Sequence, residues 1–312
     1  MVALALTACT QPSPIPVIGF LSGQSPGPWA PYVAAFREGL RETGHVEGEN
    51  VAIEFRWAEG RYDRLPALAA ELVNRHVAVM VAGGGGAPEA EAATKTIPIV
   101  FTTGNDPAEA GLVASLAHPG GNATGVSFVP AELAAKRLEL LQRLVPKASA
   151  IAMIVNPASR SAESRAGKVR DAARSFGLEL HVLTARDEQE VDAAFAALKK
   201  LGAGALLVDT DPFFNSRREQ FVALAARYAV PAIYDTRETV IDGGLVSYAG
   251  SIPDVYRQAG IYTGRILKGA KPADMPIIQP TKLELVINVR TARELGLTIP
   301  QSLLLSANEV IQ

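Results

Sequence analysis

Polar and turn-forming residues follow several apolar runs of the sequence, at the positions where parallel strands would end. In the first half these residues are Ser22, Gln24, Gly84, Gly85, Gly86, Thr103 and Asn105, and in the second half they are Asn156, Asp211, Phe213, Tyr234 and Asp235. Open parallel sheets bind their ligands at the carboxyl ends of the strands. The pattern therefore predicts a small-molecule site that these residues line.

The glycine run from Gly83 to Gly86 would expose backbone N–H groups ahead of a short helix. Such groups, together with the helix dipole, favour an anion, so a ligand carboxylate or phosphate could dock there. No lysine follows the run, and neither glycine pattern typical of nucleotide sites is present, which disfavours a nucleotide. A flexible turn that needs only permissive backbone angles explains the glycines equally well.

Acidic and aromatic residues near the predicted strand ends indicate what kind of ligand would bind. Asp211 or Asp235 could hold a ligand ammonium by charge-assisted hydrogen bonds, opposite a carboxylate bound at the glycines. The aromatic side chains that could stack on the ligand are Phe213, Tyr234 and, if its loop folds inward, Trp29. The predicted ligand is a small carboxylate-bearing solute, best an aromatic amino acid or a related aromatic acid, because side-chain amides and carboxylates for a sugar are comparatively few.

Plainer explanations stay open for several of these residues. Pairs such as Asn156-Pro157, Asp211-Pro212 and Asp106-Pro107 begin turns and cap helices without any ligand. Phe213 and Phe214 could instead fill the core near a hinge.

Constellations for catalysis or metal binding are missing. The four histidines are His45, His76, His118 and His181, and none follows a predicted strand. The nucleophile-elbow, zinc-protease and calcium-loop motifs do not occur. With a single cysteine there is no Cys/His cluster at metal-ligand spacing. We therefore expect binding without chemistry, with no cofactor and no metal.

Composition excludes several further classes of protein. The 312 residues carry 30 Lys and Arg against 32 Asp and Glu, a net charge of −2, so no basic surface for nucleic acid is indicated. Hydrophobic residues make up 48% and aromatic residues only 6%, which is typical of buried parallel strands covered by alanine-rich helices. The length suggests two domains.

Short β-branched runs alternate with segments of helical period, which predicts an α/β fold built from repeated βα units. The predicted strands are 17–21, 51–57, 77–82, 99–102, 125–129, 150–155, 179–183, 205–209, 232–234 and 245–248, with an extended return at 283–288. The predicted helices are 32–43, 64–75, 132–144, 161–176, 188–201, 216–228 and 255–268. The rhythm pauses between 117 and 130 and then begins again, so two similar Rossmann-like lobes with parallel sheets are expected.

Chain order suggests how these lobes are connected. We assign residues 17–127 and 247–275 to lobe 1, and residues 128–246 and 276–312 to lobe 2. This division makes the chain cross between lobes three times. Crossings of this kind form a hinge, because a few extended residues can rotate while both cores stay rigid.

Residues 1–16 are expected to be a signal remnant and tether. Leu6-Thr7-Ala8-Cys9 resembles a bacterial lipoprotein processing box, in which small residues precede a cysteine whose thiol takes a diacylglycerol. Nothing basic precedes the apolar run, so we expect Met1 to lie inside a longer natural signal. A disordered tail with an incidental cysteine is the alternative.

Several segments together resemble the substrate-binding proteins of ABC transporters, within the type I periplasmic binding proteins. The better understood relatives bind tryptophan and related aromatic amino acids. The segments that carry the resemblance are 17–22, 50–60, 118–125, 136–141, 211–218 and 259–269. The family often has Thr or Ser after a Gly-Gly pair that follows its third strand, whereas Gly85 and Gly86 stand here, leaving only backbone donors.

The resemblance implies a type I periplasmic binding fold with a cleft that closes on its ligand. It also implies a periplasmic receptor that delivers a solute to an inner-membrane ABC permease and touches the membrane only through a lipid anchor. An effector-sensing regulator or sensor of the same fold is the alternative, although a DNA-binding regulator would carry a helix-turn-helix before the first strand. An α/β enzyme acting on a nucleotide or sugar phosphate is less favoured by the histidine positions.

Overall fold

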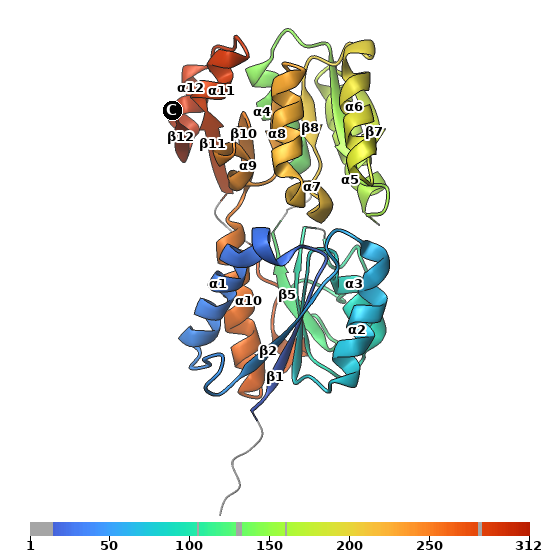
Figure 1. Cartoon of the computed structure of the whole chain (residues 1–312), viewed down its shortest axis with the longest axis vertical. Helices are drawn as coiled ribbons and strands as arrows, with labels where there is room; N and C mark the ends of the chain where they lie inside the picture. Colours follow the sequence, from blue (N-terminus) through green and yellow to red (C-terminus); the bar gives the residue numbers. More distant parts are fainter. Residues whose placement is uncertain (1–14, 105, 129–132, 160, 280–282) are drawn as a thin grey trace, which may run out of the picture.

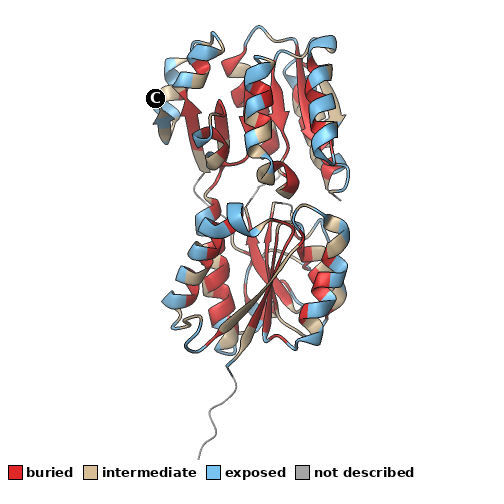
Figure 2. Cartoon of the chain, in the orientation of Figure 1, coloured by how far each residue is buried: buried red, intermediate tan, exposed pale blue. Residues whose placement is uncertain are grey.

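The computed structural model describes residues 15–104, 106–128, 133–159, 161–279 and 283–312, which form two α/β lobes stacked end to end (Figure 1). Each lobe is a sheet with helices on both faces. The central strands of each sheet are buried, most of the edge strands are only partly buried, and the outer faces of the helices are exposed (Figure 2). This arrangement follows from the apolar strand sequences, which can be buried on both faces only under two layers of helix.

Lobe 1 contains a five-stranded parallel sheet in the order β2-β1-β3-β4-β5. Its strands are β1 (Val17–Ser22), β2 (Ala52–Trp57), β3 (Val79–Gly83), β4 (Ile99–Thr103) and β5 (Ala123–Ser127). One face packs on α1 (Pro26–Glu42) and α10 (Ile252–Leu267), and the other packs on α2 (Leu65–Asn74) and α3 (Ala87–Ala93). Two 3-10 turns, Tyr62–Arg64 and Pro272–Asp274, complete the lobe.

Lobe 2 contains a seven-stranded sheet in the order β12-β11-β10-β9-β8-β6-β7, in which only the β10–β11 pair is antiparallel. Its strands are β6 (Ala150–Val155), β7 (Glu179–Thr184), β8 (Leu206–Val208), β9 (Ala232–Tyr234), β10 (Val246–Gly250), β11 (Leu283–Asn288) and β12 (Glu309–Ile311). Its helices are α4 (Leu133–Leu144), α5 (Ala162–Ser175), α6 (Glu188–Lys200), α7 (Pro212–Ser216), α8 (Arg218–Arg227), α9 (Arg237–Ile241), α11 (Val289–Glu294) and α12 (Gln301–Ser306).

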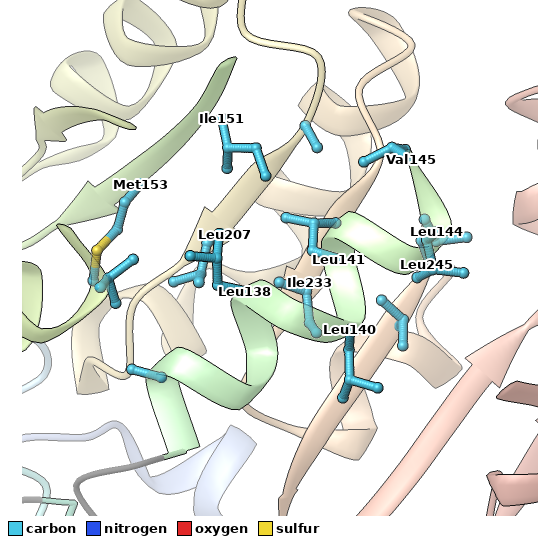
Figure 3. Close-up of a cluster of buried hydrophobic side chains, with 14 of the residues drawn as sticks. Leu138, Leu140, Leu141, Leu144, Val145, Ile151, Met153, Leu207, Ile233 and Leu245 are labelled. Carbon is cyan, nitrogen blue, oxygen red and sulfur yellow. The ribbon is translucent and has the colours of Figure 1, made fainter. Parts of the chain in front are cut away.

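The core of lobe 2 shows how apolar spacing fixes one helix on the sheet. Leu138, Leu141 and Leu144 recur at intervals of three on α4, so they share one face of the helix. Figure 3 shows this face against the sheet residues Leu207 and Ile233. All five side chains are buried, which stabilises the helix through packing rather than through its intrinsic propensity.

A close helix crossing determines the packing of α1 on α10. A Cβ atom on Gly39 would lie 1.9 Å from the carbonyl oxygen of Arg257, and one on Gly260 would lie 2.2 Å from that of Phe36. Only residues without a side chain fit at these positions. The two glycines therefore let helices that are distant in sequence pack backbone against backbone.

Every strand predicted from the sequence forms, and the α/β prediction is confirmed. The predicted helix that differs most is α1, which begins at Pro26 rather than at Tyr32. Ser25 is extended at its N-cap, and proline in the first turn needs no hydrogen-bond partner for a backbone N–H. Trp29 therefore belongs to a helix and not to a loop. The short helices α7, α9, α11 and α12 and the short strand β12 were not predicted.

Sheet membership shifts two of the predicted boundaries between the lobes. Residues 247–250, assigned to lobe 1, belong to β10 of the seven-stranded sheet. Residues 276–278, assigned to lobe 2, run beside lobe 1, where Ile278 pairs with Val126 and Ile277 enters the core. The chain leaves lobe 1 after β5, returns after β10 and leaves again before β11, so it crosses three times as predicted.

Candidate functional site

A cavity of about 140 Å³ lies between the two lobes. Segments that follow β1, β3 and β4 of lobe 1 line it, as do segments that follow β6 and β8 of lobe 2. The sequence predicts a site at the carboxyl ends of parallel strands, and the cavity lies there in both sheets.

The wall from lobe 1 is aromatic. Trp29, Tyr62, Phe128 and Tyr256 line the cavity from α1, the first 3-10 turn, the segment after β5 and α10. The Trp29 ring meets Tyr256 edge to face, with ring centroids 6.0 Å apart. Burial raises the pKa of Tyr256, so its phenol stays neutral at physiological pH. This wall offers flat apolar surface on which an aromatic ligand can stack.

The glycine turn after β3 also belongs to this wall. Gly84 and Gly85 have φ angles of 56° and 87°, in the left-handed region that favours glycine. A Cβ on Gly85 would lie 2.8 Å from Cε1 of Tyr62, so the turn also needs glycine for packing. Gly86 does not line the cavity but precedes α3 as its N-cap residue.

The wall from lobe 2 carries a buried carboxylate. Asp211 Oδ1 accepts hydrogen bonds from Asn156 Nδ2 at 3.1 Å and from the backbone N–H of Phe213 at 2.9 Å. Its Oδ2 accepts a hydrogen bond from Tyr62 of lobe 1 at 3.0 Å. Burial raises the pKa of Asp211 to about 6 in spite of these donors. The carboxylate is held in one orientation and retains acceptor capacity for one more donor.

A buried ion pair stands beside Asp211. Arg165 of α5 donates from Nε to Asp209 Oδ1 at 2.9 Å and from Nη2 to Asp209 Oδ2 at 2.6 Å. It also donates from Nη2 to the carbonyl oxygen of Thr210 at 3.2 Å. Arg165 lines the cavity, whereas Asp209 lies behind it. The pair holds the guanidinium at the cavity wall in a fixed position.

A second arginine connects the cavity to the hinge. Arg137 of α4 is buried, and it donates from Nε to the carbonyl oxygen of Tyr248 on β10 at 2.8 Å. Its Nη1 donates to Thr210 Oγ1, which lines the cavity, at 2.9 Å. The guanidinium therefore fixes a cavity side chain relative to a strand that leads into the crossing to lobe 1.

The structure places the sequence-predicted site residues in two groups. Gln24, Gly84, Gly85, Thr103 and Asp211 line the cavity. Ser22, Gly86, Asn156, Phe213, Tyr234 and Asp235 do not line it. Asn105 and Cys9 lie outside the described residues.

Residues of the second group support the wall or fill a core. Ser22 Oγ accepts the backbone N–H of Gln24 at 3.2 Å, and Asp235 Oδ2 accepts Asn215 Nδ2 at 3.3 Å. Phe213 and Tyr234, expected to stack on the ligand, pack instead in the core of lobe 2. The aromatic surface of the cavity comes instead from lobe 1.

Each of the three Asx-Pro pairs caps a turn or a helix, as the plainer explanation expects. Asp106 Oδ1 accepts the backbone N–H groups of Ala108 and Glu109 at 2.8 and 3.1 Å. Asn156 Oδ1 accepts that of Ala158 at 3.0 Å, and Asp211 caps α7. For Asp211 capping and cavity lining coexist, since one carboxylate oxygen caps the helix and the other faces lobe 1.

Sequence reasoning missed Tyr62, Phe128, Arg165 and Tyr256. Tyr62 follows β2, so the rule that ligands bind at the carboxyl ends of parallel strands applies to it as well. Arg165 and Tyr256 lie on helices, and Phe128 lies beside a crossing. No local pattern marks these three, because their place at the cavity depends on how the lobes meet.

Two further kinds of site are not found among the described residues. No group of three or more His, Cys, Asp or Glu side chains there could hold a metal ion. Within the same residues, no helix is both long and apolar enough to cross a membrane.

Comparison with known proteins gives consistent matches over nearly the whole chain. The family model described as ABC transporter substrate binding protein matches residues 15–311. The tyrosine-binding protein of Clostridioides difficile (strain R20291) is 29% identical over 267 residues, which cover 84% of this chain and 75% of that protein.

Two solved structures are similar over 95% of this chain. The ABC domain from Streptococcus pneumoniae in complex with L-Trp is 28% identical, with a TM-score of 0.87 over 99% of its chain. A conserved domain protein from Vibrio cholerae is 26% identical, with a TM-score of 0.89 over 100% of its chain.

Proposed function

The chain belongs to the family of ABC transporter substrate-binding proteins, and we propose that it is the solute receptor of an ABC importer. It captures an aromatic amino acid or a related aromatic acid between its lobes and releases it unchanged to a permease. Its fold is that of a type I periplasmic binding protein, with two α/β lobes and three crossings. In such a fold, closure around a ligand reports occupancy to the transporter.

The observation that supports this ligand class is that the two walls of the cavity carry different kinds of groups. Lobe 1 supplies the aromatic rings, and lobe 2 supplies a carboxylate and a guanidinium, Asp211 and Arg165. A free aromatic amino acid has the matching layout, with an apolar ring at one end and a zwitterion at the other. Relatives support the class, since one is named for tyrosine and another was solved with L-Trp.

Each charge of the ligand finds a complementary group in this arrangement. Asp211 takes the ammonium, because its carboxylate is fixed by three donors and retains one acceptor site. The ligand carboxylate lies toward Arg165, on the same lobe as Asp211. Asp235, the other predicted partner of the ammonium, lies behind Asn215 and acts through it.

We expect the receptor to work outside the inner membrane, tethered by a lipid on Cys9. This expectation rests on the sequence Leu6-Thr7-Ala8-Cys9. Mass spectrometry of the full-length product from a membrane fraction tests it. An unmodified thiol at Cys9, or a mature N-terminus elsewhere, overturns the lipid anchor without affecting the proposed ligand.

Calorimetry with purified protein tests the ligand and the role of Asp211. L-Tyrosine and L-tryptophan should bind, and Asp211→Ala should weaken that binding by about 10- to 100-fold, since a hydrogen bond to a charged group contributes about 1.5–3 kcal/mol. Asp211→Ala should change the affinity for the corresponding keto acids only slightly, because these ligands lack the ammonium. Asp171→Ala, at an exposed position of α5, is the matched control.

The same titrations can reject the proposal. Tight binding of a sugar, with no response to any amino acid or aromatic acid, overturns the ligand class. If Asp211→Ala lowers the affinities for the amino acid and for its keto acid equally, Asp211 does not bind the ammonium.

A further inference from the structure

Gln24 places an unpaired acceptor in the aromatic wall of the cavity. The residue follows β1, lines the cavity beside Trp29, and has only 1% of its surface exposed. Its side-chain oxygen Oε1 is buried and has no hydrogen-bond partner among the residues that the structure describes. A buried carbonyl without a donor costs about 1–3 kcal/mol, so this position is unfavourable unless something donates to it.

The surroundings of Gln24 hold its backbone in place. Its N–H donates to Ser22 Oγ at 3.2 Å, and its carbonyl oxygen accepts the N–H of Glu59 at 3.1 Å. A Cβ atom on residue 84 would lie 3.1 Å from Gln24 Cγ, so Gly84 makes room for the side chain. The fold therefore builds a position for a long amide at the cavity.

The position of Gln24 decides which end of the ligand it meets. Under the proposed function, on which this inference rests, the zwitterion lies toward Asp211 and Arg165 of lobe 2. The ring then lies against the aromatic wall of lobe 1, to which Gln24 belongs. The donor that reaches Oε1 is consequently a group on the ring.

We propose that Gln24 Oε1 accepts a hydrogen bond from an O–H or N–H group on the ring of the bound ligand. Gln24 is thus a specificity-determining residue, which selects hydroxylated or nitrogen-containing rings over a plain phenyl ring. A bound phenyl ring would exclude water from Oε1 without donating to it. The oxygen would then stay buried and unpaired in the complex. Sites built to pair a ligand hydroxyl or N–H reject analogues without it more strongly than apolar pockets discriminate by size.

Calorimetry of the full chain with three amino acids tests the inference. Wild type should bind the better of L-tyrosine and L-tryptophan at least about 10-fold more tightly than L-phenylalanine. Gln24→Met keeps the length of the side chain without its acceptor. It should lower affinity for the preferred ligand about 10-fold or more and leave L-phenylalanine unchanged or bound more tightly.

A matched control and a ligand series keep the test decisive. Gln220→Met, on α8 and away from the cavity, should leave all three affinities unchanged. 4-Fluoro-L-phenylalanine has a para substituent that cannot donate, so wild type should bind it as weakly as L-phenylalanine. This comparison needs no variant, and it decides the inference even where Gln24→Met fails to fold.

The results that overturn the inference differ from those that overturn the proposed function. Equal affinity of wild type for all aromatic amino acids, or an equal loss for each in Gln24→Met, shows that Gln24 does not meet the ring, while the proposed receptor stands. No binding of any aromatic amino acid to wild type overturns both.

Discussion

Tyr62 and Asp211 are 149 residues apart in the chain, yet the hydroxyl of Tyr62 donates a 3.0 Å hydrogen bond to Asp211 Oδ2. Tyr62 belongs to lobe 1 and Asp211 to lobe 2, so this bond joins the two lobes across the cavity. An exposed ion pair from Lys168 to Glu109 at 3.3 Å also joins the lobes, but solvent screens it. The bond between Tyr62 and Asp211 lies at the cavity, so it couples closure of the lobes to a group that lines the site.

Loss of the Tyr62 hydroxyl should weaken ligand binding by opening the lobes. Tyr62→Phe keeps the ring and removes a hydrogen bond to a charged group, which contributes about 1.5–3 kcal/mol. We expect an affinity about 10-fold or more lower by calorimetry, and a larger radius of gyration by small-angle scattering. Tyr228→Phe, at the end of α8, should change neither. Unaltered affinity in Tyr62→Phe contradicts a role for the bond in closure.

Stability should depend on pH through Asp211. Burial raises its pKa from 3.8 to about 6, so between these values the folded protein holds a proton that the unfolded chain has released. Its contribution is fully present below pH 4 and is lost as pH rises through about 6. Residue 211 cannot titrate in Asp211→Asn. The free energy of unfolding of this variant should therefore fall less over this window than that of wild type, and the difference between the two falls should reach up to about 3 kcal/mol.

Urea unfolding of the ligand-free protein at pH 4, 5, 6 and 7 measures this difference. Asp235 has a pKa of about 6 for the same reason and contributes to both proteins alike, so the difference isolates Asp211. Parallel pH profiles for wild type and Asp211→Asn would show that Asp211 has an ordinary pKa.

Arg137 should not tolerate lysine. The guanidinium donates to the carbonyl oxygen of Tyr248 and to Thr210 Oγ1 at once, and an ammonium cannot reproduce this fork. Arg137→Lys should lower the free energy of unfolding by about 1–3 kcal/mol, measured by urea titration. Arg143→Lys, on the exposed part of the same helix, should change it by less than about 0.5 kcal/mol. Similar losses of unfolding free energy in both variants would contradict a bridging role for Arg137.

The crossing of α1 and α10 should depend on glycine at position 39. In Gly39→Ala the new methyl group would meet the carbonyl oxygen of Arg257, and forcing the helices apart should cost about 1–3 kcal/mol of stability. Gly167→Ala, on α5, meets no atom within 4 Å and should stabilise the protein by about 0.5–1 kcal/mol. Thermal unfolding measures the change in stability of each variant, which should be a loss for Gly39→Ala and a gain for Gly167→Ala. A Gly39→Ala protein as stable as wild type would contradict the close packing.

Local patterns were enough to predict much of the fold. The apolar runs at Val17–Ser22 and Ala150–Val155 are buried on both faces, and such runs identify parallel strands without knowledge of their neighbours. Asp106 caps its turn with N–H groups two and three residues away, which a sequence pattern can capture. The position of the site also followed, because the carboxyl ends of parallel strands lie on one edge of a sheet.

Part of the cavity wall was decided only by tertiary structure. Tyr256 reaches the cavity from a helix that returns to lobe 1 after the second crossing, and Arg165 reaches it from a helix of the other lobe. Phe213 has a position in sequence that suits ligand stacking, yet its ring lies in the core of lobe 2. Which side of a short helix faces a cavity, and which residue of one lobe meets which residue of the other, depend on how the helices pack and where the crossings place the lobes. Those long-range contacts leave no periodic trace in the sequence.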